Sequence, residues 1–203
     1  MMTEELSPRE RRAARTREAI LDAARELISE RGAHGFSLRE VARRIDYSPA
    51  GLYEYFSNKD ELVAAVVAQG FERFSRYLLS VSTSLPPRDY LIELGMAYIR
   101  FALENPQHFM LIFNTPDLRS STPNDKFIAK GTHHVLVNGI QRCLDAGEIS
   151  NSYQRDDLVF AAWATVHGMS TLIVSHLSQD KHDWLATSRT MLEAWCRGLR
   201  PSS

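Results

Sequence analysis

The stretch SLREVARRIDYSPAGLYEYF, residues 37–56, decides the fold. Its first four residues have the pattern of a capping box, in which Ser37 and Glu40 each satisfy a backbone N–H of the other at a helix start. Apolar side chains then recur at helical spacing, at Leu38, Val41, Ala42 and Ile45. The pattern predicts a short helix over residues 38–45.

A second short helix is predicted directly after the first. Asp46-Tyr47 interrupts the apolar pattern. Ser48 is then a favoured N-cap residue, and Pro49 suits the first helical position. We expect this helix to cover residues 49–56. Two short helices joined by a tight turn, with a longer helix before them, form a helix-turn-helix.

Helical patterns continue over the rest of the chain, without convincing strand alternation or hairpin turns. The helix before the motif is expected to begin with a capping box at Ser7-Pro8-Arg9-Glu10 and to end at Gly32 and Gly35. After the motif we predict a helix over residues 59–82, capped by Ser57-Asn58. Further helices are predicted from Pro86-Pro87 to 104 and over 106–113, 126–144, 156–177 and 183–199, with a loop over 115–125. The fold is predicted to be all-α, with about nine helices. A three-helix N-terminal domain is expected at residues 1–58, and a helical C-terminal domain at residues 59–203.

Composition places the chain among ordinary globular proteins. Of its 203 residues, 44% are hydrophobic and 24% are charged, which suits a buried core. Because the net charge is -1, any nucleic-acid binding must depend on a local patch. Residues 9–17 hold five arginines against one acidic residue, which fits such a patch or a solvated helix face.

Several features indicate a cytoplasmic protein without a membrane partner. Cys143 and Cys196 lack the spacing of metal or redox motifs, so we expect reduced, small core residues. The N-terminus lacks the apolar segment of a signal peptide. The apolar stretch over residues 158–174 contains polar residues and falls short of the roughly 20 that a membrane helix needs. We interpret it as a buried or interface helix, with a membrane span as the remote alternative.

The predicted helix-turn-helix has residues suited to DNA. The second helix of this motif enters the major groove and presents its N-terminal residues to base edges. Those residues are small here, at Ser48, Pro49, Ala50 and Gly51, which allows a close approach to the bases. Hydroxyl, ammonium and helix-N-terminal groups suited to phosphate follow or precede them, at Ser37, Tyr53, Tyr55 and Lys59. Spacing alone leaves a packing role for the tyrosines and a plain surface role for Lys59 equally open.

Residues from about 16 to 67 closely resemble the DNA-binding region of the TetR family of transcriptional regulators. The resemblance rests on Ala19-Ile20-Leu21-Asp22-Ala23-Ala24, Leu27, Gly32, Ser37, Leu38, Ile45, Ser48, Gly51-Leu52-Tyr53-Glu54-Tyr55-Phe56, Lys59 and Leu62. It implies phosphate contacts for Ser37, Tyr53, Tyr55 and Lys59. It also implies positions close to the bases for Arg39 and for residues 48–51. Pro49-Ala50-Gly51 departs from more polar family members, so the resemblance does not define the operator sequence.

The C-terminal region resembles one subgroup of the same family. The similarity rests on residues 97–106, on Phe109 and Phe113, and on Trp163-Ala164-Thr165-Val166-His167-Gly168, a W-x-x-x-H-G pattern. It implies an effector pocket between helices and a homodimer formed through the last two helices. Candidate effector-binding residues are Tyr98, Phe101, Phe109, Phe113, Trp163 and His167. Such apolar side chains at helical spacing more often form a core.

His167 has three plausible partners: a group within the fold, the second subunit, or a polar atom of the effector. The histidines follow no metal-binding pattern, so we expect no metal site and no cofactor. The function expected from the resemblance is a repressor that a small, largely apolar effector releases from operator DNA. A helical enzyme using His167 and an effector-independent DNA-binding protein are the alternatives. No nucleophile motif supports an enzyme.

Overall fold

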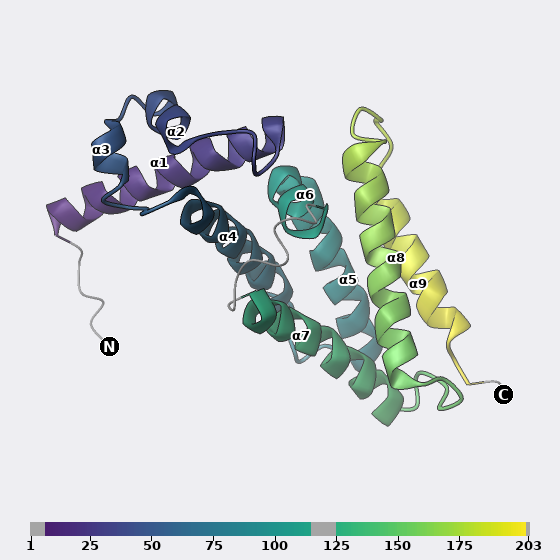
Figure 1. Cartoon of the computed structure of the whole chain (residues 1–203). Coiled ribbons are helices and arrows are strands. Elements are labelled where there is room, and N and C mark those ends of the chain that lie inside the picture. Colours follow the sequence, from purple (N-terminus) through teal and green to yellow (C-terminus); the bar gives the residue numbers. More distant parts are fainter. Residues whose placement is uncertain (1–6, 115–124, 202–203) are drawn as a thin grey trace. The chain divides into compact units, whose positions relative to one another are not determined.

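The computed structural model describes residues 7–114 and 125–201, and all regular structure within these ranges is helical (Figure 1). The helices are α1 (Pro8–Arg31), α2 (Leu38–Arg44), α3 (Pro49–Leu52), α4 (Lys59–Leu79), α5 (Pro87–Glu104), α6 (Pro106–Asn114), α7 (Asp125–Asp145), α8 (Arg155–Ser175) and α9 (Trp184–Gly198). The all-α prediction is confirmed. Most helix ends lie within three residues of the predicted ones. The loop predicted at 115–125 falls outside the described residues, except for Asp125, which begins α7.

The described chain forms two compact units. The first contains residues 7–70 and 111–114, and the second contains residues 71–110 and 125–201. α4 therefore contributes its N-terminal half to the first unit and its C-terminal half to the second.

The first unit is a helix-turn-helix built on α1. Its core contains side chains that are almost fully buried: Ile20, Ala24, Val41, Leu52, Phe56, Leu62 and Val66. Both predicted capping boxes are present. At the start of α1, the Ser7 N–H donates to Glu10 Oε2 at 2.7 Å, and the Glu10 N–H donates to Ser7 Oγ at 3.3 Å. These local bonds fix where α1 begins.

The turn between α2 and α3 depends on Asp46. Its φ of 51° lies in the left-handed region, where short polar side chains are better tolerated than bulky ones. The Tyr47 N–H then donates to the Ala42 carbonyl at 2.9 Å, which closes the turn. This turn fixes the angle at which α3 follows α2.

α3 is shorter than predicted. It ends at Leu52, whereas the sequence pattern predicted a helix to Phe56. Hydrogen bonds continue as turns, because the Phe56 N–H still donates to the Leu52 carbonyl at 3.1 Å. The chain then leaves helical geometry to place Asn58 as the cap of α4, where Asn58 Oδ1 accepts from the Glu61 N–H at 2.8 Å.

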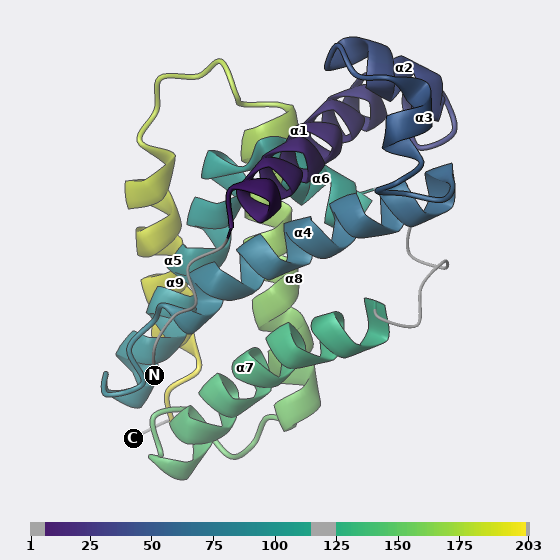
Figure 2. The ribbon, with the colours of Figure 1, turned by 90° about the vertical axis from the view of Figure 1, so that its left-hand side faces the viewer.

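The second unit is built around α5, which is buried on more than one face. α5 packs against α7, α8 and α9, and α7 packs also against α8 (Figure 2). Gly95 allows α5 and α9 to approach closely, because a Cβ at this position would lie 2.8 Å from Leu192 Cδ1. The two cysteines are buried and free, as predicted. Burial raises the pKa of the Cys143 thiol to about 12, so the thiol stays protonated.

α8 is the one described helix that is long and apolar enough to cross a membrane, with a mean hydropathy of 1.5 over its most apolar window. A third of that window is buried within the chain. Length and composition alone are weak support for a membrane span, since core helices meet the same criteria.

Candidate functional site

The N-terminus of α3 carries the residues expected to approach DNA bases. Ser48 caps the helix, with its Oγ accepting from the Gly51 N–H at 3.0 Å. This bond uses the oxygen of Ser48 as an acceptor and does not use its hydroxyl hydrogen. Pro49 and Ala50 are exposed on the first turn. α3 therefore presents a small, largely apolar end that suits close contact with base edges.

Gly51 has a packing role that its sequence position did not reveal. A Cβ at Gly51 would lie 2.7 Å from Cε1 of Tyr47, closer than real side chains approach. The Tyr47 ring also meets Tyr55 edge-on, at 6.3 Å between ring centroids. A hydrogen bond between the two hydroxyl groups raises the pKa of Tyr47. Tyr47 is thus a residue of this surface that sequence reasoning missed, although its spacing of four from Gly51 was a usable signal.

The residues predicted to bind phosphate all lie in the first unit, but they differ in how exposed they are and in the contacts they already make. Tyr53 is exposed and Tyr55 is half-buried. Lys59 Nζ lies 3.4 Å from the carbonyl oxygen of His34 and 5.5 Å from the centre of the Phe36 ring. Lys59 therefore packs beside the segment that leads into α2. Its ammonium group still has further donor capacity.

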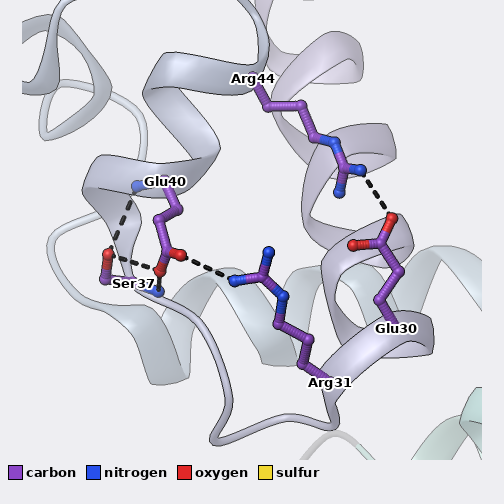
Figure 3. Close-up of polar contacts among 5 residues, drawn as sticks. All are labelled: Glu30, Arg31, Ser37, Glu40 and Arg44. Carbon is purple, nitrogen blue, oxygen red and sulfur yellow. Dashed lines mark hydrogen bonds and ion pairs between the residues drawn. The ribbon is translucent and has the colours of Figure 1, made fainter.

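Ser37 is engaged in its capping box (Figure 3). Its Oγ accepts from the Glu40 N–H at 3.3 Å and lies 3.0 Å from Glu40 Oε2. The carboxylate of Glu40 is in turn bound by Arg31 at 2.8 Å. These bonds lower the pKa of Glu40, with the Ser37 side chain as the largest cause. Ser37 thus fixes the start of α2.

A second ion pair connects α1 and α2. Arg44 Nη2 donates to Glu30 Oε1 at 2.6 Å (Figure 3), and Arg44 Nε lies 3.6 Å from Glu26 Oε2. The hydrogen bond from Arg44 lowers the pKa of Glu30. Together with the Arg31–Glu40 pair, this contact holds α2 against the C-terminal part of α1.

The exposed arginines at the start of α1 are Arg9, Arg11, Arg12, Arg15 and Arg17. Arg39, the other predicted DNA contact, is exposed on α2.

Five of the six candidate effector residues come together in the second unit. Tyr98, Phe101 and Phe109 are buried, with Trp163 and His167 facing them from α8. Ring centroids lie 6.1 Å apart for Tyr98 and Phe109, 5.6 Å for Phe109 and His167, and 6.0 Å for Trp163 and His167. Phe113, also buried, belongs to the first unit.

His167 has a hydrogen-bond partner within the fold. The Tyr98 hydroxyl lies 2.9 Å from His167 Nδ1. Burial raises the pKa of Tyr98, while a hydrogen bond with the Trp163 side chain opposes the shift. Tyr98 therefore remains protonated, and its hydroxyl shares one hydrogen bond with Nδ1 of His167. The first of the three partners considered for His167 is present.

Phe74 is a member of the cluster that was not among the candidates. Its ring lies 5.1 Å from those of both Tyr98 and Phe101. The signal in the sequence was its place on the apolar face of α4. Among the described residues, no group of three or more His, Cys, Asp or Glu side chains is placed to hold a metal ion.

The first unit is a helix-turn-helix whose α3 presents an exposed N-terminus and whose α2 is held to α1 by ion pairs. The second is a helical unit with an aromatic cluster. Together they define a DNA-binding regulator of the helix-turn-helix class. Two family descriptions match the chain: "Bacterial regulatory proteins, tetR family" over residues 20–66, and "Tetracyclin repressor-like, C-terminal domain" over residues 91–194. The second match alone covers about half of the chain. The protein belongs to the TetR family of transcriptional regulators and is not an enzyme.

Individual relatives agree with this assignment. The uncharacterized HTH-type transcriptional regulator YobS of Bacillus subtilis is 21% identical over 185 residues, which cover 91% of this chain and 92% of YobS. A tetR-family regulatory protein from Rhodococcus RHA1 has a similar structure, with a TM-score of 0.78 and 20% identity over 92% of this chain and 98% of that one. The transcriptional regulator FadR of Bacillus subtilis, solved with stearoyl-CoA, gives a TM-score of 0.72 and 20% identity over 90% and 99% of the two chains.

Proposed function

We propose that this protein is a homodimeric repressor that a small, largely apolar effector releases from operator DNA. DNA binding is assigned to residues 1–58, and effector binding and dimerisation to residues 59–203. The observation that carries the proposal is the aromatic cluster around the Tyr98–His167 pair, which combines apolar rings with polar groups, the composition typical of small-molecule sites. The complex of the similar FadR fold with stearoyl-CoA supports an effector of apolar character.

The DNA contacts are divided between two sets of residues. Ser48, Pro49, Ala50 and Gly51, together with Arg39, are proposed to lie at the bases. Ser37, Tyr53, Tyr55 and Lys59 are proposed to bind phosphates. For Ser37 the structure favours contact through the N-terminus of α2, since its hydroxyl already serves the capping box.

Dimerisation is proposed to use α8 and α9. Phe160, Trp163 and Leu172 are large apolar side chains on exposed positions of α8, and Leu185 is exposed on α9. A soluble monomer rarely exposes so many large apolar groups on adjoining helices. In a symmetric dimer the two recognition helices are expected about 34–36 Å apart or somewhat more, to meet successive major grooves.

Coupling between effector and DNA is proposed to run through α4, because this helix contributes to both units. A shift of its C-terminal half moves the helix-turn-helix that its N-terminal half supports. The coupling free energy that such regulation needs is modest, about 1–3 kcal/mol.

The proposal is tested with the purified chain and labelled DNA from upstream of its own gene and of adjacent genes. Fluorescence anisotropy is expected to show sequence-specific binding that candidate apolar metabolites weaken. A DNA affinity that no metabolite alters would favour the alternative, an effector-independent DNA-binding protein. If metabolites instead strengthen DNA binding, the effector recruits the protein to DNA and does not release it.

A further inference from the structure

We propose that a groove beside the C-terminal half of α4 binds the anionic head group of the effector, which makes the effector an anionic amphiphile. This inference rests on the proposed effector function and specifies its ligand class. The groove has a volume of 410 Å³ and is lined by Arg73, Arg76, Tyr77, Ser80 and Asn105. All five residues belong to the second unit.

Helical geometry places most of the lining on one face. Arg73, Arg76, Tyr77 and Ser80 are spaced by three, one and three residues along α4 and its C-terminal end, so their side chains lie on one side. The fifth residue, Asn105, comes from the junction of α5 and α6.

Hydrogen bonds fix the wall opposite the arginines. Asn105 Nδ2 donates to the Tyr77 hydroxyl at 3.1 Å and to the Phe101 carbonyl at 3.3 Å. The Tyr77 hydroxyl in turn donates to Glu104 Oε2 at 2.5 Å. Asn105 and Tyr77 are therefore held in place by bonds within the chain, which lowers the entropic cost of binding.

The charge of the groove suits an anion. Guanidinium groups stay protonated and bind carboxylates or phosphates through two parallel hydrogen bonds. Arg73 and Arg76 give the lining a charge of +2, which the neighbouring Glu104 reduces to +1. The first turn of α6, which begins directly after Asn105, contains no acidic residue, so its backbone N–H groups add to the positive potential.

The groove borders the aromatic cluster through Tyr77, which lines it. Tyr77 meets Phe101 at 5.6 Å between ring centroids, Phe101 meets Phe74 at 5.1 Å, and Phe74 meets Tyr98 at 5.1 Å. A charged group at the arginines thus lies at one end of a run of aromatic rings that ends at the Tyr98–His167 pair. A carboxylate or phosphate head with an apolar chain fits this arrangement better than a neutral hydrocarbon.

The test uses isothermal titration calorimetry of the full chain with laurate, lauroyl-CoA, coenzyme A and dodecan-1-ol. The double variant Arg73→Gln/Arg76→Gln is expected to weaken binding of the anionic amphiphile roughly ten- to a hundredfold, the usual effect of losing charge-assisted hydrogen bonds. Glu104→Gln keeps an acceptor for Tyr77 but removes a negative charge, so it is expected to tighten binding. Arg197→Gln/Arg200→Gln, which removes two exposed arginines at and after the end of α9, is the charge-matched control.

Binding of laurate identifies a carboxylate head, and binding of lauroyl-CoA without laurate identifies phosphate; both support the proposal if the double variant loses affinity. Equal affinity of the double variant and the wild type would overturn it, as would preference for dodecan-1-ol or no binding of either anionic amphiphile. A separate outcome tests the proposed repressor function. If the wild-type chain binds laurate through its arginines but its DNA affinity does not change, the head-group site is supported and the proposal that this ligand regulates DNA binding is contradicted.

Discussion

The Tyr98 hydroxyl lies 2.9 Å from Nδ1 of His167 and joins α5 to α8 inside the aromatic cluster. Because burial raises the pKa of Tyr98, the phenol keeps its proton. The bond fixes the imidazole ring and directs Nε2 away from Tyr98. The bond gives the polar imidazole of His167 a partner, which explains how the apolar helix α8 can carry a histidine here.

Two matched substitutions separate stability from ligand binding at this pair. Tyr98→Phe removes only the hydroxyl and is expected to lower the free energy of unfolding by roughly 0.5–1.5 kcal/mol while the ligand response persists. His167→Phe leaves the buried Tyr98 hydroxyl without its imidazole partner, so a loss of roughly 1–3 kcal/mol is expected, together with loss of the ligand response. Urea denaturation and ligand-dependent DNA anisotropy measure the two effects. A His167→Phe variant that melts and responds as the wild type would contradict both roles.

Lys59→Ala is expected to weaken binding to all DNA sequences about equally and to reduce the salt slope by roughly one per subunit, because it removes one phosphate contact. The loss of its contacts with His34 and Phe36 adds a small decrease in stability. Anisotropy titrations between low and moderate salt measure the slope. Lys181→Ala, an exposed lysine after α8, is the control. Unchanged binding at every salt concentration would remove Lys59 from the phosphate contacts.

Gly51→Ala is expected to change operator preference, because its Cβ would lie 2.7 Å from the Tyr47 ring and force that ring to move. The movement alters the surface next to Ser48 and Tyr55. Binding of a panel of operator variants measures the change. In a Tyr47→Ala background the same substitution should have a smaller effect, since the closest approach is gone and only the one to Ser48 Oγ, at 2.9 Å, remains. Equal effects in both backgrounds would mean that Gly51 acts through DNA alone.

Phe160→Lys is expected to convert the protein to a monomer at micromolar concentration. Phe160 is 66% exposed in the single chain, and Leu172 on the same helix is 52% exposed. A buried ammonium group without a partner costs far more than the contact it replaces. Sedimentation velocity measures the state, with Thr190→Lys on α9 as a control at an exposed polar position. A wild-type monomer at that concentration would overturn the proposed dimer.

Local signals in the sequence were sufficient for much of the fold. The capping boxes at Ser7 and Ser37 and the cap at Asn58 each depend on residues within four positions, and all three were predicted correctly. The end of α3 was predicted wrongly. The apolar periodicity continues through Phe56, but the helix ends at Leu52. The chain must bury Phe56 and begin α4 at Lys59, three residues later, and a continuous helix to Phe56 does not allow both.

The candidate effector site was only partly predictable for the same reason. Resemblance selected side chains on α5, α6 and α8, and the structure brings Tyr98, Phe109 and His167 together. The arginine-lined groove joins α4 to the α5–α6 junction across about 30 residues, a separation that no periodicity in either segment reveals. Contacts between segments this far apart in the sequence depend on tertiary packing and not on local sequence pattern.

An ion-pair network on the second unit predicts how stability depends on pH. Glu93 on α5 accepts from Arg189 of α9 at 2.5 Å and from Arg100 at 2.9 Å. Burial by itself raises the pKa of Glu93, but hydrogen bonds from Arg189 and Arg100 outweigh it, and the pKa is lowered from its ordinary value of 4.5. The folded state thus favours the ionised carboxylate more than the unfolded chain does.

Because the folded pKa of Glu93 is depressed, its contribution is complete above the unfolded value near 4.5 and is lost as the pH falls through the folded value. Glu93→Gln is therefore expected to be less stable than the wild type at pH 7, by roughly 0.2–1 kcal/mol for a partly exposed network. The two stabilities should converge as the pH falls below 4.5. Thermal melts from pH 7 to pH 3 measure the difference, with Asp157→Asn, an exposed acid on α8, as the control. Parallel curves for the wild type and Glu93→Gln over that range would show that the network does not respond to pH.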